Sequence, residues 1–174
     1  MNIPVIETDR LILRAHALAD FEAYAAYWAD EAVTRWTAGG KPVARDEAWL
    51  RFLRFPGHWE LMGYGFWAIE EKATGVLIGE VGFIDLKRDY DPLVNGVPEI
   101  GWVLAPASQG KGYATEAAQA CVRWGAEHFG PIRVIAAVNV ENVASIRVAE
   151  KCGFSECLRR EFHGRKAVFF DRVL

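Results

Sequence analysis

The feature that most constrains this chain is a predicted strand that runs through a glycine-rich turn into a predicted helix, over residues 99–129. Gly110 and Gly112 remove side chains from the turn, so that successive backbone N–H groups can converge on an anion. Those N–H groups also begin a helix, whose unpaired donors and dipole favour negative charge. Lys111 adds a cation. The segment therefore predicts a cradle for a phosphate group.

Three known loops resemble this turn without fitting it. A Walker A loop needs a glycine where the chain has Ala105, and a Ser or Thr where it has Gly112. A dinucleotide-binding fingerprint needs a third glycine in place of Thr115. A nucleophile elbow around Ser108 needs a glycine in place of Pro106. Apart from the phosphate cradle, the remaining interpretation is a glycine-rich turn that binds no ligand.

The rest of the sequence predicts a single domain spanning residues 1–174, without an internal repeat or a low-complexity linker. A net charge of -3 argues against a nucleic-acid partner. No apolar stretch approaches the ~20 residues that span a bilayer, and Glu7 and Asp9 stand where a signal peptide needs basic residues. Three cysteines without paired spacing and four scattered histidines predict no disulfide, no metal site and a cytoplasmic location.

The periodicity of the apolar residues predicts strands alternating with helices. Strands are expected over residues 10–15, 65–70, 76–86, 99–105, 133–140, 154–161 and 167–174. Helices are expected from the Asp20 cap to Trp28, from Asp46 to before Pro56, over 114–129, and from the Asn142 cap to Gly153. The strand–helix–strand order of the second half implies a parallel pair in a mixed sheet. The following tryptophans are expected mainly in the core: Trp28, Trp36, Trp49 and Trp59.

Three segments resemble a known family when they are taken in order. The run Gln109-Gly110-Lys111-Gly112-Tyr113-Ala114 resembles the Gln/Arg-x-x-Gly-x-Gly/Ala signature of the GNAT superfamily of N-acetyltransferases. Residues 142–145 and 150–154 resemble its second cofactor-contacting segment. Residues 8–14 resemble the RimJ/RimL-like branch, named for enzymes that acetylate ribosomal-protein N-termini. The resemblance implies the α/β GNAT (acyl-CoA N-acyltransferase) fold, with a mixed, splayed sheet of six or seven strands and helices on both faces.

The resemblance also implies where acetyl-CoA binds. The strands at 99–105 and 133–140 would splay apart and leave backbone groups without partners, which the pantetheine arm could use. Val103, Leu104 and Ala105 would contact the arm on one side. On the other side would lie Ser145 and Asn142, although Asn142 is equally well explained as a helix N-cap. The pyrophosphate would be held by Gln109, Gly110, Lys111, Gly112, Tyr113, Ala114 and Thr115.

Acetyl transfer to an amine needs a polarised thioester carbonyl, a neutral amine and a proton for the leaving thiolate. The resemblance gives the first role to the Val103 N–H, an interaction worth about 3 kcal/mol. Glu99 stands where some relatives place a general base, although a salt-bridged strand residue is an equal alternative. Many relatives place a proton-donating Tyr where this chain has Ala149. Ser145, one helical turn earlier, is the nearest substitute, followed by Tyr113.

The resemblance therefore implies an acetyl-CoA-dependent N-acetyltransferase that acts by direct attack in a ternary complex. Its acceptor would be a primary amine, on a protein N-terminus or a small molecule, and the protein would be a monomer or homodimer. The alternative is a non-catalytic acyl-CoA-binding sensor or scaffold, which only Ala149 favours. Acyl-CoA hydrolysis is a weaker alternative, because no nucleophile–base pair is visible in the sequence.

Overall fold

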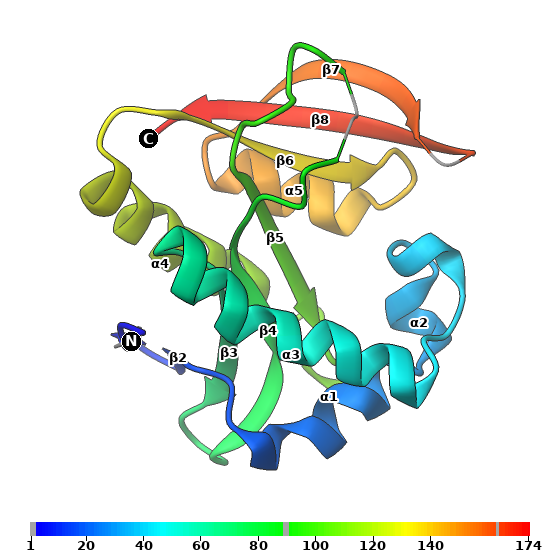
Figure 1. Cartoon of the computed structure of the whole chain (residues 1–174), viewed down its shortest axis with the longest axis vertical. Helices are drawn as coiled ribbons and strands as arrows, with labels where there is room; N and C mark the ends of the chain where they lie inside the picture. Colours follow the sequence, from blue (N-terminus) through cyan, green and yellow to red (C-terminus); the bar gives the residue numbers. More distant parts are fainter. Residues whose placement is uncertain (1–2, 89–90, 163) are drawn as a thin grey trace.

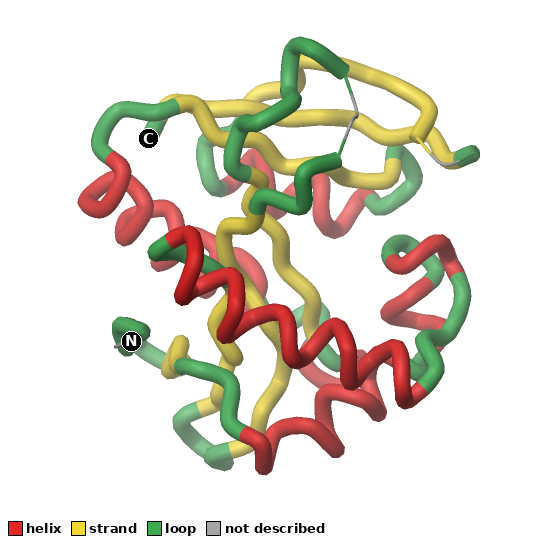
Figure 2. The backbone as a smooth tube through the Cα atoms, viewed as in Figure 1, coloured by secondary structure: helices red, strands yellow, loops and turns green. Residues whose placement is uncertain are grey.

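A computed structural model describes residues 3–88, 91–162 and 164–174. The strands form one mixed sheet in the order β1-β2-β3-β4-β5-β6-β8-β7, in which only β5 and β6 are parallel neighbours (Figures 1 and 2). The strands are β1 (Ile6–Glu7), β2 (Leu11–Arg14), β3 (Phe66–Glu71), β4 (Val76–Ile84), β5 (Glu99–Leu104), β6 (Arg133–Asn139), β7 (Ser155–Phe162) and β8 (Arg165–Val173). The mixed α/β sheet is confirmed. Its eight strands exceed the predicted six or seven, because Ile6–Glu7 adds a two-residue edge strand opposite β2.

Helices cover both faces of this sheet, as predicted. They are α1 (Phe21–Trp28), α2 (Glu31–Thr34), α3 (Arg45–Met62), α4 (Tyr113–Phe129) and α5 (Val143–Lys151). The first two helices and most of α3 pack on one face, and α4 and α5 pack on the other (Figure 1). The side chains of β5 alternate between these faces, so Ile100 and Leu104 join the cluster beneath α4 while Val103 joins the cluster beneath α1 and α3.

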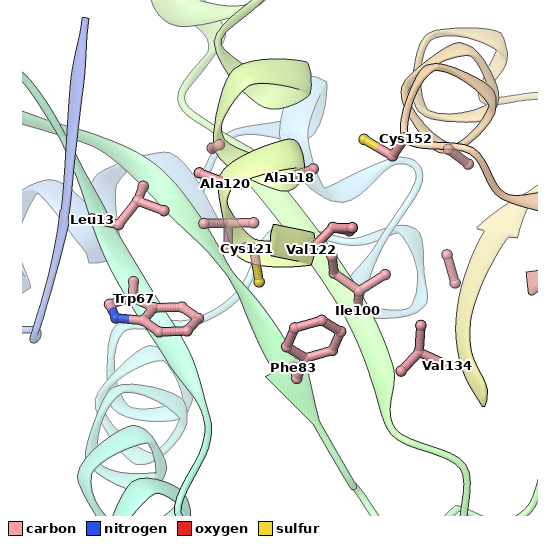
Figure 3. Packing of buried hydrophobic residues seen from close by; sticks show 14 of the residues in the cluster. Leu13, Trp67, Phe83, Ile100, Ala118, Ala120, Cys121, Val122, Val134 and Cys152 are labelled. Atoms are coloured by element: carbon pink, nitrogen blue, oxygen red, sulfur yellow. The ribbon is translucent and has the colours of Figure 1, made fainter. Parts of the chain in front are cut away.

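The larger core cluster lies between the sheet and α4. Phe83, Ile100 and Val122 meet there (Figure 3). The helix approaches the sheet closely because Gly125 carries no side chain: a Cβ at that position would lie 2.8 Å from the Phe83 ring. This contact fixes the axis of α4, and with it the position of the glycine-rich turn at its N-terminus.

Two local predictions fail at the first helices. Asp20 does not cap α1 through its side chain, which accepts hydrogen bonds from the Arg14 guanidinium and the Ala17 N–H. Helix α3 continues past Pro56 to Met62 instead of ending before the proline. A proline inside a helix costs about 3 kcal/mol. Burial of Phe55 and Trp59, about 1.5–3 kcal/mol for each such side chain, offsets that cost, and Trp59 Nε1 also donates to the Phe66 carbonyl at 3.0 Å.

Candidate functional site

Strands β5 and β6 separate after a single register pair, which opens the sheet in its middle. That pair is Glu99 opposite Ile135, where the Ile135 N–H donates to the Pro98 carbonyl at 3.0 Å. By contrast, β4 and β5 pair continuously over Gly79–Ile84, and β6 pairs with β8 along its whole length. The splayed pair expected from the sequence is therefore present, and Figure 1 shows β5 and β6 diverging.

A cleft of about 690 Å³ lies over this opening. Four of the predicted site residues line it together: Glu99, Val103, Asn142 and Ser145. Leu104, Ala105 and the turn at 109–115 lie beyond its lining, at the C-terminal end of β5. The cleft and the glycine-rich turn thus occupy successive positions along β5, which is the order that a long ligand with a phosphate group would require.

The register of β5 decides which of its backbone groups face the opening. The Ala105 N–H donates to the Ile78 carbonyl of β4, and Val103 is the register partner of Glu80. Because backbone groups alternate along an antiparallel strand, the Val103 N–H points toward β4 and away from β6. The N–H groups of Trp102 and Leu104 point toward the opening instead. The backbone donors of this stretch that face the opening are therefore those of Trp102 and Leu104, and the role expected for the Val103 N–H stays a prediction.

The glycine-rich turn is shaped by two residues in left-handed backbone conformations. Gly110 has φ 75° and Gly112 has φ 83°, values that glycine adopts without strain. Gly112 is also the N-cap of α4 and supplies no capping side chain. The first amides of α4 therefore remain available to an anion. Gln109 ties the turn to the sheet, because its Nε2 donates to the Leu104 carbonyl at 3.0 Å.

The outside of this turn is braced by the start of the chain. Arg10 Nη1 donates to the Lys111 carbonyl at 2.9 Å, and Arg10 Nε donates to Glu116 of α4 at 2.7 Å. Thr8 Oγ1 donates to the same carboxylate at 2.6 Å. Tyr113 adds two contacts to this brace. The Arg10 guanidinium lies over its ring, and its hydroxyl donates a hydrogen bond to Glu71 at 2.6 Å. Sequence reasoning treated residues 8–14 only as a branch signature and missed this brace.

The start of α5 presents a hydroxyl to the cleft. Asn142 caps the helix as predicted, since its Oδ1 accepts from the Ser145 N–H at 3.2 Å. Ser145 Oγ accepts from the Trp102 indole N–H at 3.3 Å, which leaves its own proton free to be donated. Ala149, by contrast, is fully buried in the core. A tyrosine at 149 would overpack that core.

Two glutamates lie on the same face of the sheet within this cleft, and the sequence prediction named only one. Glu99 is at the mouth, 3.5 Å from Arg88. Glu80 is only 2% exposed, and it accepts a hydrogen bond from the Tyr27 hydroxyl at 3.2 Å. Burial raises the pKa of the Glu80 carboxyl to about 8, although the positive charges of Arg54 and Arg51 oppose this rise. A lone charge within the apolar run 76–84 was the signal that could have revealed it.

The Glu80 carboxyl lies among aromatic side chains, with the Arg54 and Arg51 guanidinium groups beyond ion-pair distance. His16 Nε2 lies 3.8 Å from its carboxylate, and burial lowers the pKa of that imidazole to about 4. His16 is therefore neutral near pH 7 and does not pair with Glu80 as a cation. The Trp28 indole lines the cleft nearby, and its N–H lies within reach of the Tyr24 and Tyr27 hydroxyls. Of the four tryptophans predicted mainly for the core, Trp28 and Trp59 are buried there and Trp49 packs against it, whereas Trp36 is half-buried and belongs to none of the core clusters of the described chain. Trp28 and Trp36 line the cleft.

The described part of the chain contains neither a membrane-spanning helix nor a cluster of metal-binding side chains. Over residues 3–88, 91–162 and 164–174, no helix combines the length and apolarity needed to cross a bilayer. In the same ranges, no group of three or more His, Cys, Asp or Glu side chains is placed to hold a metal ion.

Comparison with known proteins bears on the same site. The family profile described as an acetyltransferase (GNAT) domain matches residues 10–155. The uncharacterized N-acetyltransferase YoaA of Bacillus subtilis is 31% identical over 153 residues, covering 88% of this chain and 84% of that protein. A structure from Bordetella pertussis assigned to the GNAT acetyltransferases has a TM-score of 0.86 and 32% identity, covering 98% of this chain and 99% of that one. The structure of YncA of Salmonella typhimurium, with its cofactor acetyl-CoA, has a TM-score of 0.70 and 25% identity, and the match covers 94% of this chain and 93% of that one.

Proposed function

Because the chain belongs to the GNAT acetyltransferase family and is an acetyl-CoA-dependent acetyltransferase, we propose that it acetylates a primary amine by direct attack in a ternary complex. The observation that carries this proposal is the divergence of β5 from β6 next to the Gly110–Gly112 turn. The turn offers amides for a pyrophosphate, and the opening offers backbone groups for a pantetheine arm. A nucleotide-linked thioester fits both features at once.

The proposed binding residues follow this arrangement. Gln109 to Thr115 would surround the pyrophosphate, with Lys111 adding a positive charge and Arg10 bracing the turn. The arm would lie along β5, bordered by Val103, Leu104 and Ala105, and would face Asn142 and Ser145 of α5. The amides of Trp102 and Leu104 would polarise the thioester carbonyl, a role worth about 3 kcal/mol.

Ser145 is the proposed proton donor to the leaving thiolate. Replacement by alanine is expected to slow acetyl transfer in single-turnover measurements by about 10-fold, because general acid help is lost while the turn still binds the nucleotide. The loss should shrink for an acyl donor with a more acidic thiol, which needs less help to leave. Ser155→Ala, at the start of β7, is the matched control. Equal single-turnover rates for Ser145→Ala and the parent would remove Ser145 from the mechanism.

The role of Glu99 as the general base stays a prediction. Its carboxylate faces the cleft but lies near the Arg88 guanidinium at the mouth. That ion pair already engages the Glu99 carboxylate, which is the structural alternative to a role as base. In the comparison of Glu99→Gln with Glu80→Gln, the larger loss of kcat identifies the residue that takes the proton from the amine.

Two finer assignments are likewise proposals. The RimJ/RimL-like branch rests on residues 8–14, and with it the choice between a protein N-terminus and a small amine as acceptor. The monomeric or dimeric state and the cytoplasmic location also stay predictions. The function itself is tested by incubating the protein with acetyl-CoA and a panel of amines and N-terminal peptides while free thiol is measured. Amine-dependent thiol release is expected, whereas tight CoA binding without turnover on any acceptor would favour the sensor alternative.

A further inference from the structure

The floor of the cleft holds a carboxyl group that forms no ion pair with a Lys or Arg side chain of the described chain. Glu80 lines the cleft, is 2% exposed, and receives one hydrogen bond, from the neutral Tyr27 hydroxyl. His16, 3.8 Å away, is kept neutral by burial, and the Arg54 and Arg51 guanidinium groups act on Glu80 only from beyond ion-pair distance, so burial keeps the carboxyl protonated in the empty cleft near neutral pH. A buried charge is costly unless it is paired. A cationic ligand group at this position would provide the missing partner.

The position of Glu80 places such a group close to the reacting carbonyl. Glu80 is the register partner of Val103, so the two side chains stand side by side on the face covered by α1 and α3. Val103 is flanked on β5 by Trp102 and Leu104, whose amides face the opening. Glu99 lies farther away, at the other end of β5 and near Arg88. An amine held by Glu80 would therefore sit beside the proposed thioester position.

The mouth of the cleft carries the opposite charge. Among the charged residues that line it, Glu47 pairs with Arg51 at 2.6 Å and Glu99 with Arg88 at 3.5 Å. Three cations are left over: Arg54, Arg165 and Lys166. In the described part of the chain, none of the three has a carboxylate within ion-pair distance. The Arg165 guanidinium lies directly against Gly40, so it reaches from β8 to the loop before α3.

We propose, building on the acetyltransferase function above, that the acceptor is a small zwitterionic amine of the amino-acid type, whose amine binds Glu80 and whose anionic group binds Arg54 and Arg165. The Trp28 ring lines the same cleft and offers the ligand an apolar contact. Amines without an anionic group would leave the three cations at the mouth, Arg54, Arg165 and Lys166, without a partner of opposite charge. Polyamines place a second positive charge near them, at a cost of about 1 kcal/mol per close pair even in water.

The same carboxylate can serve the chemical step. Binding of the ammonium group favours the ionised form of Glu80, whose proton leaves to solvent, and the ammonium group then gives one proton to this carboxylate, which leaves a neutral amine beside the thioester. The nitrogen lone pair forms the C–N bond, the C–S bond breaks, and the electron pair departs with sulfur. The second proton of the amine is lost to solvent, and the thiolate takes a proton from Ser145, which recovers one from water. Glu80 keeps the proton that it took from the ammonium group and so returns to its resting state, and the sum is amide, CoA thiol and one proton.

The test compares acceptors that differ only in the anionic group. The twenty L-amino acids are assayed with acetyl-CoA beside phenethylamine, phenylalaninamide, spermidine and an alanyl peptide, and amino-acid binding to the CoA complex is measured separately by calorimetry. At least one amino acid is expected to have kcat/KM about 10-fold or more above its decarboxylated or amidated counterpart. For L-phenylalanine, these counterparts are phenethylamine and phenylalaninamide.

Variants then locate the two ends of the acceptor. Arg54→Gln and Arg165→Gln are expected to raise KM for the preferred amino acid about 10-fold and to leave KM for its decarboxylated amine unchanged. A residue with a merely structural role would not show this split. Glu80→Gln should lower kcat about 100-fold for every acceptor, and Glu80→Asp should recover part of the rate. Arg159→Gln, an exposed arginine of β7 paired with Glu156, is the control and should match the parent.

Some outcomes overturn the inference while leaving the acetyltransferase function in place. One is equal or better turnover of phenethylamine, spermidine or the peptide than of every amino acid. Another is an equal loss for all acceptors in Arg54→Gln and Arg165→Gln. The inference about the acceptor is also overturned if calorimetry detects no binding of any amino acid, whether or not other amines are acetylated. Amino-acid binding that is lost in Arg165→Gln supports it even where transfer fails, and in that case it is the proposed function that fails.

Discussion

Replacement of Gly112 by aspartate is expected to weaken acetyl-CoA binding by about 100-fold or more while the sheet and α4 stay folded. The new carboxylate would stand at the N-cap of α4, where the unpaired amides of the first turn meet the pyrophosphate. Each like-charge contact costs about 1 kcal/mol at 4 Å even in a watery dielectric, and a pyrophosphate carries more than one charge. A Cβ at this position also lies 3.4 Å from Arg10 Nη2, so the aspartate would engage the guanidinium that braces the turn.

The matched control is Gly112→Asn, which has the same shape and tolerates the left-handed conformation at φ 83° but brings no charge. Calorimetry with CoA should show at least a 10-fold weaker affinity for the Asp variant than for the Asn variant. Acetyl-pantetheine, which lacks the pyrophosphate, should be used by the Asp variant and the parent at similar rates. Equal CoA affinity in the parent and the Asp variant would place the cofactor elsewhere and remove the basis of the proposed function.

The fold was predictable where local pattern and tertiary packing agree. The alternation of apolar residues located both ends of β3, β4, β5 and β6 to within two residues. The continuation of α3 through Pro56 was not predictable, because the buried contacts of Phe55 and Trp59 that offset the proline come from other elements. The two-residue strand Ile6–Glu7 is too short to leave a periodic signal.

The site was predictable to the extent that its residues are neighbours in sequence. The Gly110–Gly112 turn and the Asn142 cap are local, and both are found as expected. The contacts of Arg10 with residues 111–116 span about a hundred positions, and no local pattern reports them. The direction of the Val103 amide depends on the register between β5 and β4, since a shift by one residue reverses every backbone group.

The buried pair of titratable groups below the cleft should give the protein an unusual dependence of stability on pH. The pKa of Glu80 is about 8 in the folded protein against 4.5 as its ordinary value, so the folded state binds the extra proton between these limits. Stability therefore falls as the pH rises from about 4.5 to 8, with a slope of up to about 1.4 kcal/mol per pH unit. The pKa of His16 is about 4 against 6.5, so its contribution to stability rises as the pH rises from 4 to 6.5.

The two slopes oppose each other below pH 6.5, and only the Glu80 slope remains above it. The free energy of unfolding of the parent, measured in urea without ligand, is therefore expected to fall by about 2 kcal/mol between pH 6.5 and 8. Glu80→Gln should lose this fall and should instead gain stability from pH 4 to 6.5, where His16 acts alone. The neighbouring Tyr24 and Tyr27 do not titrate in this range, because burial raises the pKa of both hydroxyls above its ordinary value. Glu60→Gln, on the exposed side of α3, is the control with the same change in charge and should follow the parent.

Parallel curves for the parent and Glu80→Gln from pH 6.5 to 8 would mean that Glu80 is already ionised in the folded protein. The cleft would then need a resident cation among its own residues, and the amine would no longer be the group that completes it.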